Sequence, residues 1–173
     1  MKPQIRRQLD ELSQRTGKEY GKLVQKLLAI AFLESGAEHL VESSIQGIDL
    51  QVRLAGIDHA FEVKTSEGAD ITLGKKDLEG MTGHTRQGHA VYVATLTSGL
   101  FTNWIFARFH PGELPPAKKL SAFQLRPYRC RDLEARITAA FDSAVEHHAE
   151  LAITDGQRGL DQVLSTYPKR HLA

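Results

Sequence analysis

The sequence predicts an α/β fold in which a mixed central β-sheet is flanked by helices. Three observations support this prediction. Apolar and polar residues alternate over 48–54 and again over 59–65, as in the two strands of a hairpin. The stretch 90–96 (AVYVATL) is β-branched and aromatic, which is typical of a buried central strand. Apolar residues at helical spacing before, between and after these segments predict the covering helices.

Two helices are expected before the hairpin. Apolar residues recur at helical spacing over 3–15 and, as a broader stripe, over 19–35, where Gly36 is a plausible stop signal. Glu19 lies at the border of the second stripe. Its carboxylate either faces a sheet edge or is simply a first-turn acid favoured by the helix dipole. A short opening strand is expected over 41–46.

The hairpin has two unlike faces, because successive side chains in a strand point to opposite sides. One face is apolar and carries Ile48, Leu50, Val52, Leu54, Phe61 and Val63. The other is charged and polar and carries Asp49, Gln51, Arg53, Glu62 and Lys64. This second face gathers the candidate site residues.

The length of the turn decides which of these residues lie opposite each other. If the strands turn at Ala55-Gly56, the register places Asp49 directly across from Glu62. If the loop is Ala55–Asp58, Asp49 instead faces Lys64 and Glu62 is diagonal to it. Both loops keep the three residues on one face, whereas a three-residue loop would separate them.

Two carboxylates about 5 Å apart at their Cβ atoms repel each other unless a cation lies between them. Such a pair is what a divalent metal site needs, and a lysine two residues further on can stabilise a phosphate beside it. The alternative is an ordinary half-buried hairpin in which Glu62 and Lys64 are solvated and pair weakly with Asp49 or Arg53.

Four further elements are expected after the hairpin. They are a helix over 73–87, the strand 90–96, a neighbouring strand over 101–109 with Trp104 in the core, and a long helix over 132–151. A break at Thr154-Asp155-Gly156 precedes a last short helix. We therefore expect a core over residues 1–112 and a C-terminal helical appendage over 113–173, packed on the same domain.

Composition is that of a globular protein of one domain, with 173 residues and 25% charged residues. No apolar run is long enough for a membrane span, and the N-terminus lacks the apolar region of a signal peptide. The single cysteine, Cys130, excludes an internal disulfide and a cysteine-rich zinc site. We expect a cytoplasmic protein.

Basic residues are segregated along the chain although the net charge is only +1. They are frequent over 1–30 and over 114–131, and the latter stretch has no acid. Such segregation suits a phosphate-facing surface, although solvated side chains are the simpler explanation. The candidate nucleic-acid contacts are Lys75, Lys76, Arg86, Lys118, Lys119, Arg126 and Arg129.

The segment GIDLQVRL followed by FEVK resembles the core of the PD-(D/E)xK nuclease superfamily, which has the restriction-endonuclease-like fold. Its form is most similar to the Mrr-type restriction nucleases and the archaeal-type Holliday-junction resolvases. The resemblance covers about residues 17–97. It implies that Asp49, Glu62 and the Val63 carbonyl bind Mg²⁺, for which Mn²⁺ can substitute, and that Lys64 positions or activates the attacking water.

The first helix departs from the family's pattern. The family often has an acid just after an aromatic residue there, but Tyr20 is followed by Gly21. The nearest acid is Glu19, which we include among the catalytic candidates, and Glu34 is a weaker substitute. The proline that usually precedes the strand aspartate is replaced by Ile48.

The predicted function is a Mg²⁺-dependent DNA endonuclease of the restriction, repair or junction-resolving type, acting on phosphodiester bonds. A single site cuts one strand, so paired cuts imply a homodimer. Two alternatives stay open: a catalytically inactive nucleic-acid-binding module with the same fold, and an interaction protein whose hairpin acids are surface charges.

Overall fold

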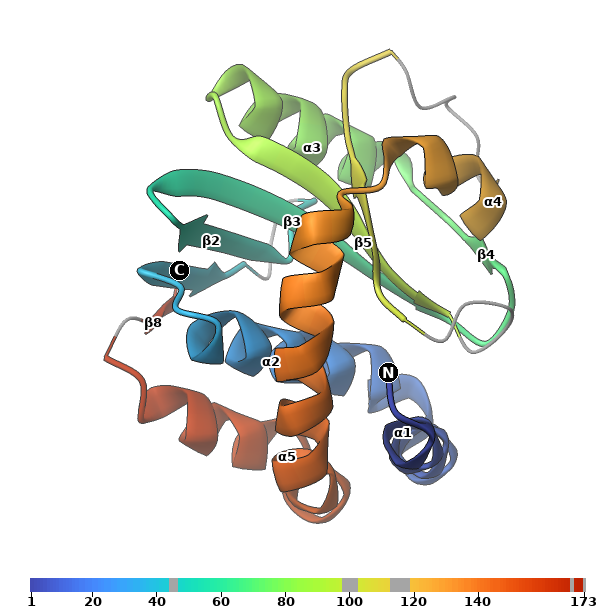
Figure 1. Ribbon diagram of the computed structural model, residues 1–173, viewed down its shortest axis with the longest axis vertical. Coiled ribbons are helices and arrows are strands. Elements are labelled where there is room, and N and C mark those ends of the chain that lie inside the picture. The colour runs from blue at the N-terminus through green and yellow to red at the C-terminus, as the bar shows by residue number, and fades with distance from the viewer. Residues whose placement is uncertain (44–46, 98–102, 113–118, 169, 173) are drawn as a thin grey trace.

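A six-stranded mixed sheet with the strand order β6-β5-β3-β2-β1-β8 forms the centre of the protein (Figure 1). The computed structural model describes residues 1–43, 47–97, 103–112, 119–168 and 170–172. The strands of the sheet are β1 (His39–Glu42), β2 (Leu50–Leu54), β3 (Ile57–Ser66), β5 (Ala90–Thr97), β6 (Ile105–Arg108) and β8 (Arg170–Leu172). The predicted fold class, a mixed sheet flanked by helices, is confirmed.

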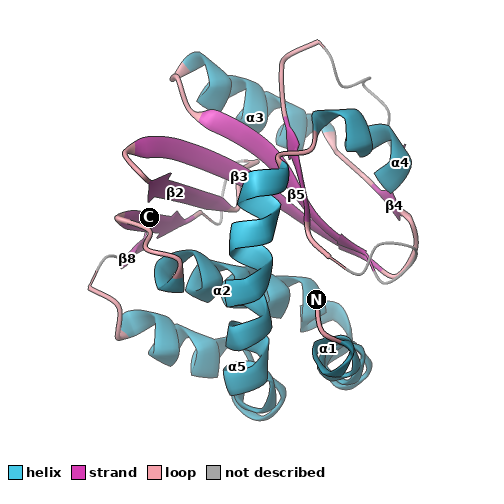
Figure 2. Cartoon of the chain, in the orientation of Figure 1, coloured by secondary structure: helices cyan, strands magenta, loops and turns pink. Residues whose placement is uncertain are grey.

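Helices cover both faces of this sheet (Figure 2). One face packs against α1 (Pro3–Thr16), α2 (Tyr20–Glu34) and α5 (Arg131–Ser165). The other packs against α3 (Lys75–Arg86) and α4 (Ala122–Leu125). A separate two-stranded sheet pairs β4 (Asp70–Ile71) with β7 (Leu120–Ser121) beside α4. Both faces of the sheet are therefore covered, so the polar face of the hairpin is not simply open to water.

The hairpin β2–β3 closes through the two-residue turn Ala55-Gly56. Both residues have positive φ, 52° and 74°, as a type I′ turn requires. Leu54 pairs with Ile57 and Leu50 with Phe61; the regular pairing stops there, and the Asp49 N–H also donates to the Phe61 carbonyl. The predicted two-residue turn is correct and the four-residue loop is wrong, while Asp49 and Glu62 lie outside the regular pairing and interact through their charges.

One prediction about the hairpin faces needs correction, and one part of the alternative interpretation is excluded. Ile48 belongs to the core cluster under α3, not to the cluster that contains Leu50, because the regular alternation starts only after Asp49. Glu62 is not solvated, since only 4% of the residue is exposed. Helix α3 and its neighbours cover the face that a half-buried hairpin would leave in water.

Most of the C-terminal region is a single helix, α5, interrupted at the predicted break. Gly156 has φ 60° and ψ −144°, so the chain bends there and continues as a helix to Ser165. Before the bend, α5 crosses α2 and contributes Ile137, Phe141 and Val145 to the same core cluster as α2. Trp104 is fully buried in that cluster, as predicted.

Candidate functional site

Asp49 lies immediately before β2 and is fixed by contacts to neighbouring elements. Its backbone N–H donates to the Phe61 carbonyl at 3.0 Å. Its Oδ2 accepts the Val63 N–H at 2.9 Å, and its Oδ1 lies 3.3 Å from the Lys22 Nζ on α2. The carboxylate is therefore held at the start of β2, beside the part of β3 that pairs only with β5.

Gly47 fixes the approach of the chain to Asp49. It has φ +64°, and a Cβ at this position would lie 2.3 Å from the Lys76 carbonyl oxygen on α3. Only glycine satisfies both the left-handed conformation and the close approach. The loop before Asp49 is thus tightly packed against the first turn of α3.

Glu62 is a buried acid in the middle of β3. Burial raises its pKa from the ordinary 4.5 to about 7, and the negative charges of Asp49 and Asp77 add to this increase while Lys64 opposes it. The effect of Asp49 on the pKa of Glu62 shows that the two carboxylates lie close enough to repel each other. A cation between them would relieve this repulsion.

Lys64 lies between two acids. Its Nζ is 2.7 Å from Glu62 Oε1 and 2.8 Å from Asp77 Oδ2, and 24% of its side chain is exposed. Burial by itself would lower the pKa of this ammonium, but Glu62 and Asp77 together raise it above its usual value. Lys64 is therefore charged in this arrangement.

Asp77, on the first turn of α3, is the residue of this site that the sequence did not reveal. Its Oδ2 also accepts the Gly74 N–H at 2.8 Å, which caps the helix. Burial would raise its pKa, but the hydrogen bonds from Lys64 and Gly74 lower it below the usual value. An acid three residues after a helix-starting glycine was a visible capping signal, but it gave no sign of a contact with Lys64.

The α2 side of the site contains Lys22 and Gln25, which were also not predicted. Lys22 Nζ donates to Gln25 Oε1 at 2.9 Å, and Gln25 Nε2 donates to the Asp49 carbonyl at 3.4 Å. Glu19 lies one helical turn before Lys22, with its Oε2 3.4 Å from where a Cβ on Gly156 would be. Its carboxylate thus lies beside the bend of α5, and its catalytic role stays a prediction.

The weaker substitute, Glu34, is at the far end of α2. It is exposed and lies near Tyr167, whose pKa is raised first by burial and then by the charge of Glu34.

Within the described ranges, no three His, Cys, Asp or Glu side chains gather closely enough to hold a metal ion by themselves. The site so far consists of the Asp49–Glu62 pair, Lys64 and Asp77.

The predicted nucleic-acid contacts are spread over two regions. Lys75 and Lys76 are exposed on the first turn of α3, next to Asp77, while Arg86 is exposed at its other end. Lys119 pairs with Asp70 at 3.1 Å and Arg126 is exposed on the surface near α4. Lys118 lies outside the described residues. All these roles stay predictions.

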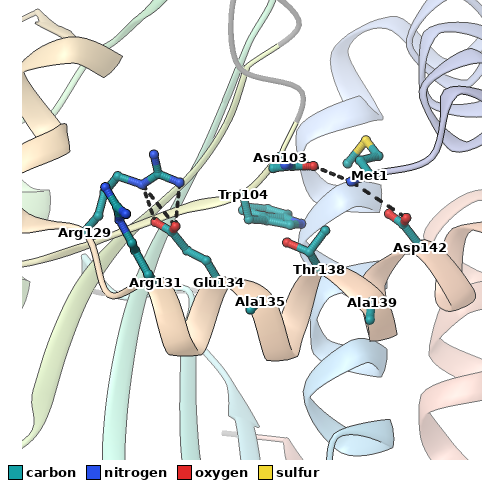
Figure 3. A pocket seen from close by; sticks show the side chains of 10 residues that line it. All are labelled: Met1, Asn103, Trp104, Arg129, Arg131, Glu134, Ala135, Thr138, Ala139 and Asp142. Atoms are coloured by element: carbon teal, nitrogen blue, oxygen red, sulfur yellow. Dashed lines mark hydrogen bonds and ion pairs between the residues drawn. The ribbon is translucent and has the colours of Figure 1, made fainter.

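Arg129 has a structural partner. Its Nη2 is 2.6 Å from Glu134 Oε2, and Glu134 Oε1 also accepts the Phe106 N–H at 3.0 Å. Figure 3 shows this pair at one end of a pocket of about 580 Å³ between the start of α5 and Trp104. At the other end the N-terminal amine contacts Asn103 and Asp142. None of the predicted catalytic residues lines this pocket.

Comparisons with known proteins bear on the fold. No family profile matches this sequence, and no curated protein matches it significantly. Among solved structures, the chain is similar to Hjc of Archaeoglobus fulgidus, a Holliday junction resolvase from an archaeal hyperthermophile. The TM-score is 0.53 at 17% identity, over 66% of this chain and 95% of that one. No described helix is long and apolar enough to cross a membrane. The chain thus has the predicted restriction-endonuclease-like fold, shared with this resolvase.

Proposed function

We propose that this protein is a metal-dependent endodeoxyribonuclease that hydrolyses phosphodiester bonds, and that branched DNA such as a four-way junction is its substrate. The observation that carries the proposal is the Asp49 carboxylate bonded to the Val63 N–H, next to Glu62 in β3, with the Lys64 Nζ 2.7 Å from Glu62 Oε1. The fold shared with the archaeal resolvase supports the junction as the substrate.

The donor set suits Mg²⁺ or Mn²⁺. Carboxylate oxygens are the ligands that these hard cations prefer, and the pKa of Glu62, raised by burial and by the charge of Asp49, marks a place where positive charge is favourable. Asp49, Glu62 and the Val63 carbonyl would hold the ion, and water would complete its coordination. The Val63 N–H already points to Asp49, and the carbonyl of the same residue in a strand points to the same side.

A bound divalent cation would supply the charge that lowers the pKa of a nearby water and offsets negative charge on the phosphate. Residues of the chain would position the attacking water and the scissile phosphate. Lys64, charged and only partly exposed, would donate to the attacking water or to the scissile phosphate. The covered faces of the sheet would hold the two acids in place while the DNA binds beside the part of β3 that extends past the start of β2.

DNA would contact the protein through the exposed lysines of α3. Lys75 and Lys76 project from the turn that also carries Asp77, so a phosphate bound by them would lie close to Lys64. Arg126 and Lys119 are further candidates. A junction offers equivalent strands on opposite sides, so we include a homodimer in the proposal, one site for each cut strand.

The test is cleavage of a labelled panel of linear duplex, single strand, flap and four-way junction, with Mg²⁺, Mn²⁺ or EDTA. We expect metal-dependent cutting of the junction by the wild type and none by Asp49→Asn. The matched control is Asp58→Asn, which removes a half-exposed acid from the same hairpin and should cut normally. Junction binding without cutting in either metal would overturn the nuclease and favour a non-catalytic binding module.

A further inference from the structure

We propose that Asp77 is a positioning residue that holds the Lys64 ammonium in place from the α3 side of the site. This inference rests on the proposed function, because it assigns Lys64 a task in cleavage. Asp77 Oδ2 lies 2.8 Å from Lys64 Nζ and 2.8 Å from the Gly74 nitrogen. One oxygen therefore joins the lysine of β3 to the first turn of α3.

Capping alone does not explain this arrangement. A helix N-terminus is satisfied by a neutral acceptor such as serine, threonine or asparagine. Here the same oxygen also receives an ammonium, and the pair is shielded, with side chains 24% and 20% exposed. The Lys75–Glu79 pair on the same helix is 3.7 Å long and 89% and 63% exposed, as surface pairs usually are.

Lys64 needs a second partner because Glu62 cannot both bind the metal ion and hold the Lys64 ammonium. The side chain of lysine has four rotatable methylene groups, so one hydrogen bond leaves its end poorly fixed. When Glu62 binds a cation, its negative charge is offset and its attraction for Lys64 falls. Asp77 is then the acid of the site that still retains the ammonium, at a point next to the exposed Lys75 and Lys76.

The consequence is a link between the helix that faces the DNA and the catalytic lysine. A shift of the first turn of α3 would move the Asp77 carboxylate and, with it, the Lys64 ammonium. Gly47 packs against the Lys76 carbonyl and so ties the same turn to the segment that carries Asp49. Asp77 thus acts through Lys64 and does not itself contact the reacting atoms.

The experiment compares wild type, Asp77→Asn, Lys64→Met and the double variant. Asparagine keeps an oxygen for the Gly74 N–H and removes only the charge that holds Lys64. We expect Asp77→Asn to lower kcat for metal-dependent junction cleavage by about 10- to 100-fold, the usual effect of removing an outer-shell partner, with KM nearly unchanged. In the Lys64→Met background it should cost nothing more. Glu79→Gln, which breaks the exposed pair on α3, is the matched control and should leave kcat unchanged.

A second readout does not depend on cleavage. The ¹⁵N-ammonium signal of Lys64, assigned by its loss in Lys64→Met, should be sharp in metal-free wild type and broadened in Asp77→Asn. An unchanged signal, or additive effects of the two substitutions on kcat, would overturn the inference. If the wild type cuts no DNA, the proposed function fails, and the ammonium signal still decides whether Asp77 holds Lys64.

Discussion

Replacing Glu62 by glutamine should stabilise the metal-free protein above neutral pH while destroying its proposed function. Glutamine has the same shape but never carries the buried negative charge. Because the folded protein binds a proton at Glu62 up to about pH 7 and an unfolded chain only up to about 4.5, folding takes up protons between these values. The free energy of unfolding of the wild type therefore falls as the pH rises through this window.

The size of the pKa shift of Glu62 determines how much the free energy of unfolding changes with pH. A difference of about 2.5 pKa units corresponds to about 3 kcal/mol, and this penalty is absent below pH 4.5 and complete above pH 7. The penalty needs no large correction for solvent, because only 5% of the Glu62 side chain is exposed. Glu62→Gln should thus gain about 3 kcal/mol relative to wild type between pH 4.5 and pH 8.

Urea unfolding of both proteins in EDTA, at a series of pH values, measures this difference. Glu79→Gln, an exposed change on α3, is the control and should alter stability by less than about 0.5 kcal/mol at any pH. A constant difference between wild type and Glu62→Gln across the series would show that the ionisation of Glu62 does not lower the stability of the folded protein. Added Mn²⁺ should stabilise the wild type at pH 8 and leave Glu62→Gln unaffected.

Three further predictions test other parts of the structure. Glu134→Ala should lower the free energy of unfolding by about 3 kcal/mol in urea titrations, because it leaves a guanidinium and a buried backbone N–H without their acceptor; a loss below about 1 kcal/mol would contradict this. Gly47→Ala should destabilise the protein by about 1–3 kcal/mol more than Gly88→Ala, since both have positive φ but only Gly47 would clash with α3; equal losses in thermal unfolding would count against it. Lys22→Met should tighten Mn²⁺ binding by up to about fivefold, because it removes a half-exposed cation that pairs with Asp49; weaker binding in calorimetry would show that Lys22 supports the site.

The hairpin was the most predictable part of this molecule. Its alternation and its turn restricted the register to two possibilities, and the positive φ of Ala55-Gly56 selects the two-residue turn in which Leu54 pairs with Ile57. What the alternation could not predict was burial of the charged face. That depends on α3 lying over β3 and β5, a long-range packing that no local pattern contains.

Asp77 and Lys22 were missed for the same reason. Each lies on a helix whose sequence shows only a solvated or capping residue, and each meets the hairpin only after the helices pack on the sheet. The short elements α4, β4 and β7 were missed because two to four residues are too few to establish a period. The strand β8 was missed because its pairing with β1 joins residues at opposite ends of the chain.

The most direct test of the proposed cation site is Mn²⁺ binding by isothermal titration calorimetry, with wild type, Asp49→Asn and the hairpin control Asp58→Asn. If Asp49 and Glu62 form the cation site, Asp49→Asn should weaken binding by more than about tenfold, since loss of even an outer-shell partner costs that much. Asp58→Asn should bind as the wild type does. Equal affinity in wild type and Asp49→Asn would contradict the site, and with it the nuclease built on this pair of acids.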